Sequence, residues 1–241
     1  MNIVKVKDYE EMSEKVCDLF VSRLHAIKKP VFGVATGSTP KGLYKCLVNK
    51  YREGKISFKD ATFFNLDEYI GLDQDHPSSY TYYMKEKLYN HIDVVPHNIH
   101  LPNGKAKDLK KECLDYEQLI HDVQQIDLQI LGIGINGHIG FNEPGTPFDS
   151  RTDVVQLTDS TIQVNSRFFD SIEEVPSQAI TMGIGTIMES KEIVLLISGE
   201  QKADALHQTI YGEVTEDFPA SVLQRHDNVT VIADAAAFGE A

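Results

Sequence analysis

The sequence is poor in basic residues, and this shortage excludes two classes of partner. Its 241 residues include 23 Lys and Arg against 36 Asp and Glu, which gives a formal net charge of −13. Nucleic acids and anionic membranes are bound by clustered Lys and Arg, so we expect neither as a partner. An anionic small-molecule substrate must then bind at a local site that opposes the overall negative field.

Cysteines are also scarce, and long apolar runs are absent. Cys17, Cys46 and Cys113 form an odd set without CxxC or zinc-ligand spacing, which is typical of a reducing compartment. Cys17 and Cys46 lie in apolar helical patterns, which predicts that they are small core residues. The N-terminus has no signal-peptide core, and no run approaches the roughly 18 apolar residues of a membrane span. We therefore expect a cytoplasmic protein.

What the chain does contain is an alternation of short apolar runs with amphipathic segments. Helices are indicated after a capping box at Asp8 and Glu11, after Pro40, over 79–89 and 109–123, and after 183 and 197. Strand-like runs cover 31–36, 61–66, 98–101, 126–131, 180–183, 193–197 and 229–233. This predicts one α/β domain over 1–241, with a doubly wound, mostly parallel, Rossmann-like sheet and helices on both faces.

The first candidate site follows the strand at 31–36, because such folds bind ligands beyond the carboxyl ends of their strands. Thr36, Gly37, Ser38 and Thr39 form a turn that opens a helix, where hydroxyl and free amide groups can meet a phosphate. Gly42 is followed by Leu43, so this is not a nucleotide P-loop. The alternative is an ordinary helix capped by Thr.

Two acids, Asp67 and Glu68, directly follow the strand at 61–66. Acids at the end of a buried strand are costly unless they are solvated, paired or used. One interpretation is a general base that the sheet holds in place. The alternative is a helix cap or a surface turn.

A glycine-rich loop, Gly132–Gly137, follows the strand at 126–131 and matches GxGxxG. A dinucleotide site needs a helix that starts inside this motif, and the Asn-Glu-Pro-Gly-Thr-Pro run at 142–147 prevents a long one. The loop instead carries Asn136, His138 and Glu143, which indicates a histidine that moves protons beside a carboxylate. One His and one Glu are too few ligands for a metal, so metal binding is the weaker alternative.

Two basic residues are candidates for holding an anion. Lys202 lies in the first turn of the helix expected after 193–197. The helix dipole opposes a cation at that position, and a residue that breaks this local rule is a candidate for a functional role. Arg167 lies in a stretch of poor periodicity, and we expect a mobile flap near 158–175. For each the alternative is a solvated surface cation.

Taken together, these motifs resemble the glucosamine-6-phosphate deaminase family over nearly the full length, and the short, non-allosteric type in particular. The segment Gly-His-Ile-Gly-Phe-Asn-Glu-Pro at 137–144 is highly specific. The other matching stretches are 35–40, 65–69, 150–152, 165–169, 199–203 and 219–224.

The resemblance implies conversion of glucosamine 6-phosphate and water to fructose 6-phosphate and ammonia, without a cofactor or metal. It implies that Asp67 removes the C2 proton in an aldose–ketose isomerisation, and that His138 assists opening of the sugar ring, supported by Glu143 and position 136. It implies a phosphate site formed by Thr36, Gly37, Ser38, Thr39, Arg167 and Lys202.

Two features depart from the family's pattern. Many members have Asp where this chain has Asn136, so the charge acting on His138 must come from Glu143. Allosteric members carry basic residues where this chain has Asp153 and Val155, and they have a longer C-terminal tail. We therefore expect no allosteric activation and a monomer, with a small homo-oligomer as the alternative.

Rival functions are 6-phosphogluconolactonase, which has a different glycine loop, and a non-enzymatic sugar-phosphate sensor.

Overall fold

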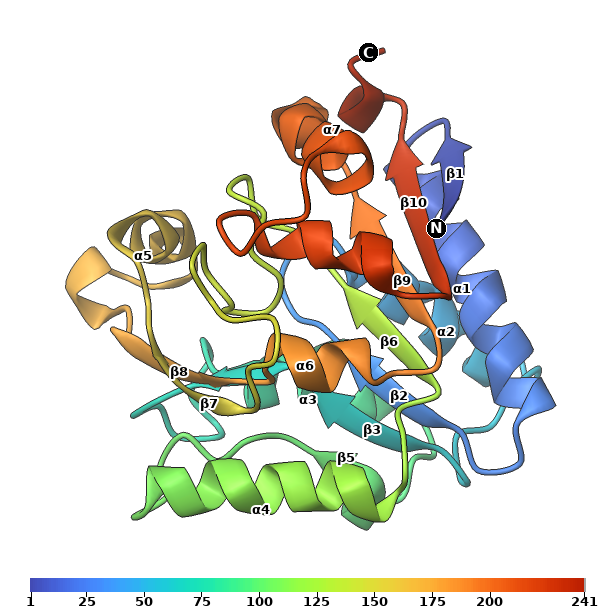
Figure 1. Cartoon of the computed structure of the whole chain (residues 1–241). Helices are drawn as coiled ribbons and strands as arrows, with labels where there is room; N and C mark the ends of the chain where they lie inside the picture. The colour runs from blue at the N-terminus through green and yellow to red at the C-terminus, as the bar shows by residue number, and fades with distance from the viewer. Residues whose placement is uncertain (241) are drawn as a thin grey trace.

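The computed structural model describes residues 1–240, which form a mostly parallel α/β sheet with helices on both faces (Figure 1). The central sheet has seven strands in the order β1-β10-β9-β6-β2-β3-β5, and every neighbouring pair is parallel. The strands are β1 (Asn2–Val6), β2 (Val31–Val34), β3 (Thr62–Asn65), β5 (Ile99–His100), β6 (Leu128–Leu131), β9 (Ile193–Ile197) and β10 (Val229–Asp234). The predicted fold class is confirmed.

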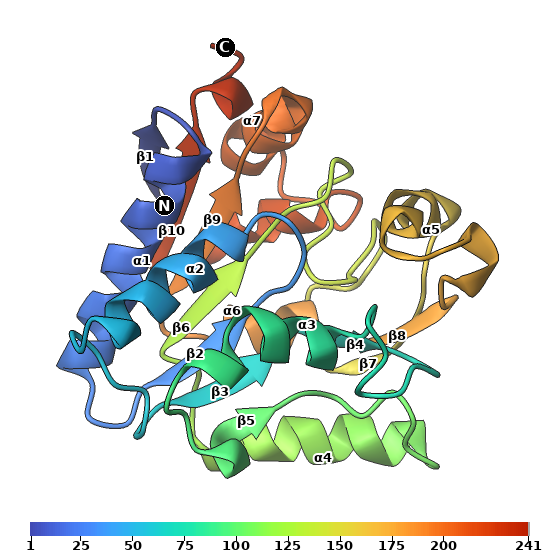
Figure 2. The ribbon, with the colours of Figure 1, turned by 180° about the vertical axis from the view of Figure 1, so that it is seen from behind.

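Of the seven α-helices within residues 1–240, six pack on this sheet, and two core clusters show which face each of the six covers; α5 packs in a separate, smaller cluster. The cluster on one face takes side chains from α1, α2 and α3, and the cluster on the other takes them from α4, α6 and α7 (Figures 1 and 2). The helices are α1 (Tyr9–Ala26), α2 (Lys41–Arg52), α3 (Tyr80–Lys87), α4 (Leu109–Asp122), α5 (Asp159–Asn165), α6 (Ile184–Met188) and α7 (Ala203–Tyr211). The predicted cap of the first helix is confirmed, because the Asp8 side chain accepts from the Glu11 N–H at 2.9 Å.

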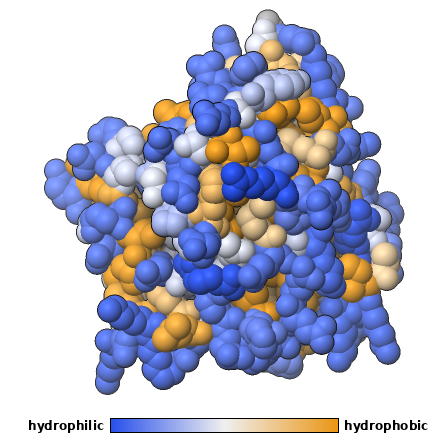
Figure 3. All heavy atoms as spheres, viewed as in Figure 1, coloured by the Kyte–Doolittle hydropathy of each residue, from blue (hydrophilic) through white to orange (hydrophobic). Residues whose placement is uncertain are grey.

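Short 3-10 turns complete the helical structure. They span Tyr89–His91, Pro96–Asn98, Ser166–Phe168, Ile172–Glu174, Glu200–Lys202, Pro219–Arg225 and Ala236–Phe238. None of the helices within residues 1–240 is long and apolar enough to span a membrane. Most of the face shown in Figure 3 is hydrophilic, with apolar side chains in scattered patches, some of them over the α5 region.

A second, three-stranded antiparallel sheet lies beside the first and differs from the sequence prediction. Its order is β4 (Asp67–Tyr69), β8 (Gln178–Thr181) and β7 (Asp153–Gln156). The run at 180–183 was expected to join the parallel sheet, but it forms part of β8 instead. β7 escaped prediction because it has polar ends and only two apolar residues, and β4 because it is three residues long.

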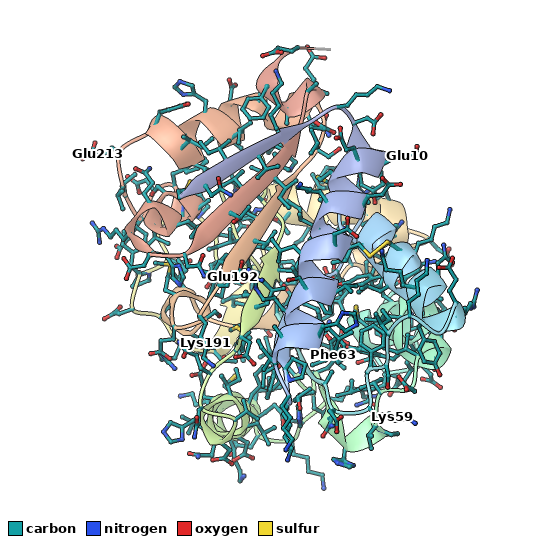
Figure 4. The ribbon with its side chains drawn as sticks, turned by 90° about the vertical axis from the view of Figure 1, so that its right-hand side faces the viewer. Glu10, Lys59, Phe63, Lys191, Glu192 and Glu213 are labelled. Carbon is teal, nitrogen blue, oxygen red and sulfur yellow. A yellow bond between two sulfur atoms is a disulfide. The ribbon has the colours of Figure 1, made fainter. Side chains whose placement is uncertain are left out.

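Cys17 is a buried core residue as expected, and Cys46 packs against the same cluster, but the bond between them was not predicted. They form a disulfide between α1 and α2, with Cα atoms 6.2 Å apart (Figure 4). The two helices pack in the same core cluster, a proximity that the 29-residue separation in sequence did not reveal. Cys113 is free and buried. Because disulfides are rare in reducing compartments, cysteine usage no longer supports a cytoplasmic location.

Candidate active site

The candidate site lies where the strand order of the central sheet reverses. From β2 the chain adds β3 and β5 on one side, then returns to place β6, β9 and β10 on the other. Ligands of open α/β sheets bind outside the carboxyl ends of the strands at such a point. The loop over 35–40 leaves β2 there, and the loop over 132–138 leaves β6.

The loop after β2 has the features of an anion site. Gly37 has a φ of +95°, a conformation that favours glycine and turns the chain sharply toward α2. The N-cap of α2 is Pro40 and makes no side-chain cap bond, so the alternative of a Thr-capped helix is wrong. Within residues 1–240, none of the N–H groups of 36–39 donates a hydrogen bond. These four amides therefore present unpaired donors just before α2, whereas the N–H of Gly42 in its first turn donates to the hydroxyl of Tyr9.

Lys202 and Arg167 lie close enough for their charges to interact. Lys202 is the last residue of the turn Glu200–Lys202 and the N-cap of α7, one residue earlier than predicted. Its Nζ donates to the carbonyl of Ile133 at 2.8 Å. Burial lowers the pKa of Lys202, and the positive charge of Arg167 lowers it further.

Neither of these cations has a carboxylate partner in the described part of the chain. Lys202 is partly buried, so the alternative of a solvated surface cation does not describe it, whereas Arg167 is exposed and stacks over Phe168. Two neighbouring cations without a counter-ion repel each other, and a bound anion would relieve that repulsion.

Asp67, the first residue of β4, is buried, and its carboxyl group has no hydrogen-bond partner within residues 1–240, although its main chain pairs with β8. Burial raises its pKa to about 8, and the neighbouring charge of Glu68 contributes. A Cβ atom at Gly140 would lie 3.7 Å from Oδ2 of Asp67, so the loop that follows His138 passes beside this carboxyl group. A carboxyl group that titrates near neutral pH can both accept and return a proton.

Glu68 has a different role, and the predicted acid pair therefore divides. Its Oε1 accepts from the N–H of Tyr80 at 2.9 Å, and its Oε2 accepts from the N–H of Thr81 at 2.8 Å. Burial raises the pKa of Glu68, although these hydrogen bonds oppose the shift. The alternative of a helix cap or surface turn fails for both acids, because they lie in β4; Glu68 accepts from the first turn of α3, whose N-cap is Ser79.

The histidine loop forms a connected triad. Asn136 donates through Nδ2 to Oε2 of Glu143 at 2.8 Å, and its Oδ1 lies 2.8 Å from Nδ1 of His138. Because an amide oxygen can only accept, Nδ1 of His138 carries a proton, and Nε2 of the neutral ring is the free base. Nδ1 also lies 3.5 Å from Oε2 of Glu143. Asn136 therefore bridges the two groups instead of supplying charge.

Glu143 is held ionised by its neighbours. Burial on its own would raise its pKa, but hydrogen bonds from His138, Thr161 and Asn136 lower it to about 2. Thr161 donates to Oε1 of Glu143 from α5, and Thr158 donates to the same oxygen at 3.3 Å. Glu143 therefore keeps a negative charge 3.5 Å from Nδ1 of His138.

Thr161 and Tyr80 were not predicted from the sequence. The Tyr80 hydroxyl donates to that of Tyr69 at 3.3 Å, and the Tyr80 N–H donates to Glu68 at 2.9 Å. Tyr80 thus connects α3 with β4, the strand that begins at Asp67. No local pattern marks such a residue, because its partners come from distant segments.

No group of three or more His, Cys, Asp or Glu arranged to hold a metal ion occurs among residues 1–240.

The Ser-Arg-Thr stretch at 150–152 joins neighbouring elements through hydrogen bonds. Arg151 pairs with Glu117 and Glu189, and the N–H of Thr152 donates to Glu117 at 2.9 Å.

Comparison with known proteins agrees with this geometry. A family model described as glucosamine-6-phosphate isomerases/6-phosphogluconolactonase matches residues 7–232. Glucosamine-6-phosphate deaminase of Oceanobacillus iheyensis is 54% identical over 237 residues, 98% of this chain and 95% of the relative. The protein of the same name from Clostridioides difficile is 50% identical, with the same coverage.

Solved structures give the same result. A monomeric glucosamine-6-phosphate deaminase is 46% identical, with a TM-score of 0.98 and full coverage of both chains. A 6-phosphogluconolactonase from Trypanosoma cruzi has a TM-score of 0.79 at 19% identity, covering 99% of this chain and 96% of its own, so it shares the fold alone. On the match of its sequence to the family model and to relatives at about half identity, the chain belongs to the family of glucosamine-6-phosphate isomerases and 6-phosphogluconolactonases.

Proposed function

We propose that this chain converts glucosamine 6-phosphate and water into fructose 6-phosphate and ammonia. The observation that carries the proposal is the buried, unpaired carboxyl group of Asp67 beside the loop of His138 and Glu143. An aldose–ketose isomerisation needs a base for C2, and a cyclic sugar needs a second group that opens its ring. The relatives named glucosamine-6-phosphate deaminase support the same substrate.

Ring opening is assigned to His138. Its free Nε2 takes the proton of the C1 hydroxyl as the bond between C1 and the ring oxygen breaks, and a proton returns to that oxygen. Asn136 fixes the tautomer through Nδ1, and Glu143 stabilises the imidazolium that forms.

Asp67 carries out the isomerisation. Its ionised form removes the C2 proton while the substrate's C2 ammonium group gives a proton to the C1 carbonyl oxygen, which leaves an enolamine. The carboxylic acid then returns its proton to C1, which gives an iminium group at C2. Water adds to C2, and the nitrogen leaves as ammonia. One base thus serves two proton transfers, for which a pKa near the working pH is well suited.

The phosphate is held by the loop over 36–39 together with Arg167 and Lys202. The unpaired amides just before α2 and the two cations supply donors and positive charge in a chain whose net charge is −13.

A mobile flap over 158–175 completes the proposed site. α5 and the turn after it lie to one side of the central sheet (Figures 1 and 2), and this segment exposes Val164, Phe168 and Ile172. Closure over substrate would bring Arg167 to the phosphate. Hydrogen exchange over 158–175 should slow when substrate or inorganic phosphate binds, and unchanged exchange there would contradict a flap.

The chain is proposed to act as a cytoplasmic monomer on a small molecule, without a nucleic-acid partner and without a cofactor. The similar deaminase that is described as monomeric supports the assembly state, and light scattering tests it.

Ammonia release from glucosamine 6-phosphate, measured beside hydrolysis of 6-phosphogluconolactone, tests the function. We expect ammonia and fructose 6-phosphate in equal amounts and no lactone hydrolysis above the uncatalysed rate. Lactone hydrolysis without ammonia would instead assign the lactonase reaction, and binding without turnover would indicate a sensor.

A further inference from the structure

Three tyrosine hydroxyl groups converge on the backbone of the loop after β2. They belong to Tyr9 in α1, Tyr44 in α2 and Tyr83 in α3, so each comes from a different helix. Tyr83 donates to the carbonyl oxygen of Gly37 at 2.7 Å, and Tyr9 donates to that of Ser38 at 3.1 Å. Tyr44 donates to the carbonyl oxygen of Ala35. Every acceptor is main chain, so the hydroxyl groups contact no atom that the proposed reaction uses.

These bonds fix the direction of the N–H groups on the other side of each peptide. In a trans peptide the carbonyl of one residue and the N–H of the next point in opposite directions. No peptide bond within residues 1–240 is cis. The hydrogen bonds from the tyrosines to the three carbonyl oxygens therefore turn the N–H groups of the following residues away from the tyrosines. These N–H groups belong to Thr36, Ser38 and Thr39. These are among the amides that have no acceptor in the described chain.

Burial raises the pKa of Tyr44 and of Tyr83 well above its ordinary value, so both hydroxyl groups stay protonated and act as donors. Tyr9 makes a second contact, because its oxygen accepts from the N–H of Gly42 at 2.9 Å and so ties the loop to the first turn of α2. Within residues 1–240, Tyr82, next to Tyr83 in α3, makes no hydrogen bond through its hydroxyl, so the contacts depend on position and not on tyrosine content.

We propose that Tyr9, Tyr44 and Tyr83 are positioning residues that orient the loop's peptide N–H groups toward the substrate's phosphate. This inference rests on the proposed function, because it requires that the loop over 36–39 binds a phosphate. The N–H groups are already oriented in the folded chain, so the loop loses little conformational entropy when the phosphate binds.

Tyr83→Phe tests the inference, because it removes one hydroxyl group and leaves the ring. The KM for glucosamine 6-phosphate and the Ki for inorganic phosphate should both rise, each roughly threefold to tenfold, the net effect of one hydrogen bond. The kcat should stay unchanged, because no reacting atom is touched. Tyr9→Phe, in another helix, should give the same pattern, and Tyr82→Phe is the matched control that should change neither constant.

The outcomes separate this inference from the proposed function. Ammonia release by the wild-type protein is measured first, and its absence would contradict the proposed function itself. If the wild-type protein is active and competed by inorganic phosphate, yet Tyr83→Phe and Tyr9→Phe leave KM and Ki unchanged, the positioning role is wrong and the function stands. A fall in kcat at constant Ki would also overturn the role, because it would place the hydroxyl groups in the chemistry.

Discussion

Thr161, in the short helix α5, donates a hydrogen bond to Oε1 of Glu143, the carboxylate that supports His138. The bond joins the proposed flap to the proposed ring-opening group, so the flap and the carboxylate cannot move independently. It is also one of the interactions that lower the pKa of Glu143 to about 2. The placement of α5 and the charge of Glu143 are therefore coupled.

Thr161→Val should weaken this coupling. Valine keeps the shape of the side chain but leaves Oε1 of Glu143 without its best donor, so turnover of the cyclic substrate should fall roughly threefold to tenfold. Steady-state kinetics of Thr161→Val and Thr161→Ser check the prediction, because serine restores the hydroxyl and should restore the rate. Ser160→Ala is the control on the same turn. A serine variant as slow as the valine variant would contradict a role for the hydroxyl.

Glu143→Gln should slow the reaction of cyclic glucosamine 6-phosphate by about 10²-fold, because the imidazolium of His138 loses its negative partner. The deficit should be smaller for an open-chain analogue that needs no ring opening. Parallel assays with both substrates decide the matter, and equal slowing of the two would remove the ring-opening role.

Asp67→Asn should reduce kcat by about 10²–10⁴-fold while KM changes little, because an amide cannot remove the C2 proton. In the wild-type protein, kcat/KM should rise with pH up to about 8 as Asp67 ionises. Exchange of the C2 proton with solvent isolates this step. Exchange at the wild-type rate in the variant would show that another group is the base.

The same substitution should change the pH dependence of stability. The pKa of Asp67 in the folded chain is about 8, above its unfolded value, so the folded state holds a proton that the unfolded state has lost. Stability therefore falls as pH rises through that window, from about 4 to about 8. Urea unfolding of Asp67→Asn should show a weaker decline than the wild-type protein, with the two converging at acid pH. Parallel declines would mean that the carboxyl group is not buried as described.

The parts of the fold that the sequence predicted well are those in which one local signal decides the structure. Strands such as β9 (Ile193–Ile197) are fully buried, so their apolar runs are continuous. The missed strands, β1, β4 and β7, are short and carry polar residues. Their pairing partners, β10 for β1 and β8 for the other two, lie far along the chain. Local pattern cannot reveal such pairing, and the disulfide of Cys17 and Cys46 was missed for the same reason.

For the candidate site, Asp67, His138, Asn136 and Glu143 could be proposed from the sequence because each lies just beyond a strand or in a specific glycine loop. The structure places them on neighbouring segments, and their catalytic roles stay predictions. Tyr80 and Thr161 act through hydrogen bonds to residues in other segments. Their contributions depend on tertiary contacts, which spacing along the chain does not encode.

Lys202→Met should raise the KM for glucosamine 6-phosphate with little change in kcat. A charge-assisted hydrogen bond contributes about 1.5–3 kcal/mol, which corresponds to roughly tenfold to a hundredfold in KM. Arg167→Met should act in the same direction, and Lys45→Met, on the exposed side of α2, is the matched control. Kinetics with glucosamine lacking the phosphate complete the test. If KM for that sugar rises by the same factor, the two cations do not act on the phosphate.

The last prediction concerns regulation, and it follows from the charges around the Ser-Arg-Thr stretch. Asp153 is exposed at the start of β7 and would repel a phosphate, by about 1 kcal/mol at 4 Å in bulk water and more where solvent is excluded. The neighbouring cation, Arg151, is paired with both Glu117 and Glu189, so it is not free to compensate. An activator must bind one state of the protein better than another, and an anionic effector finds no free cation in this stretch. Rate curves should therefore be hyperbolic and unchanged by N-acetylglucosamine 6-phosphate. Sigmoidal curves that become hyperbolic when the acetylated sugar is added would show that an effector site exists despite these charges.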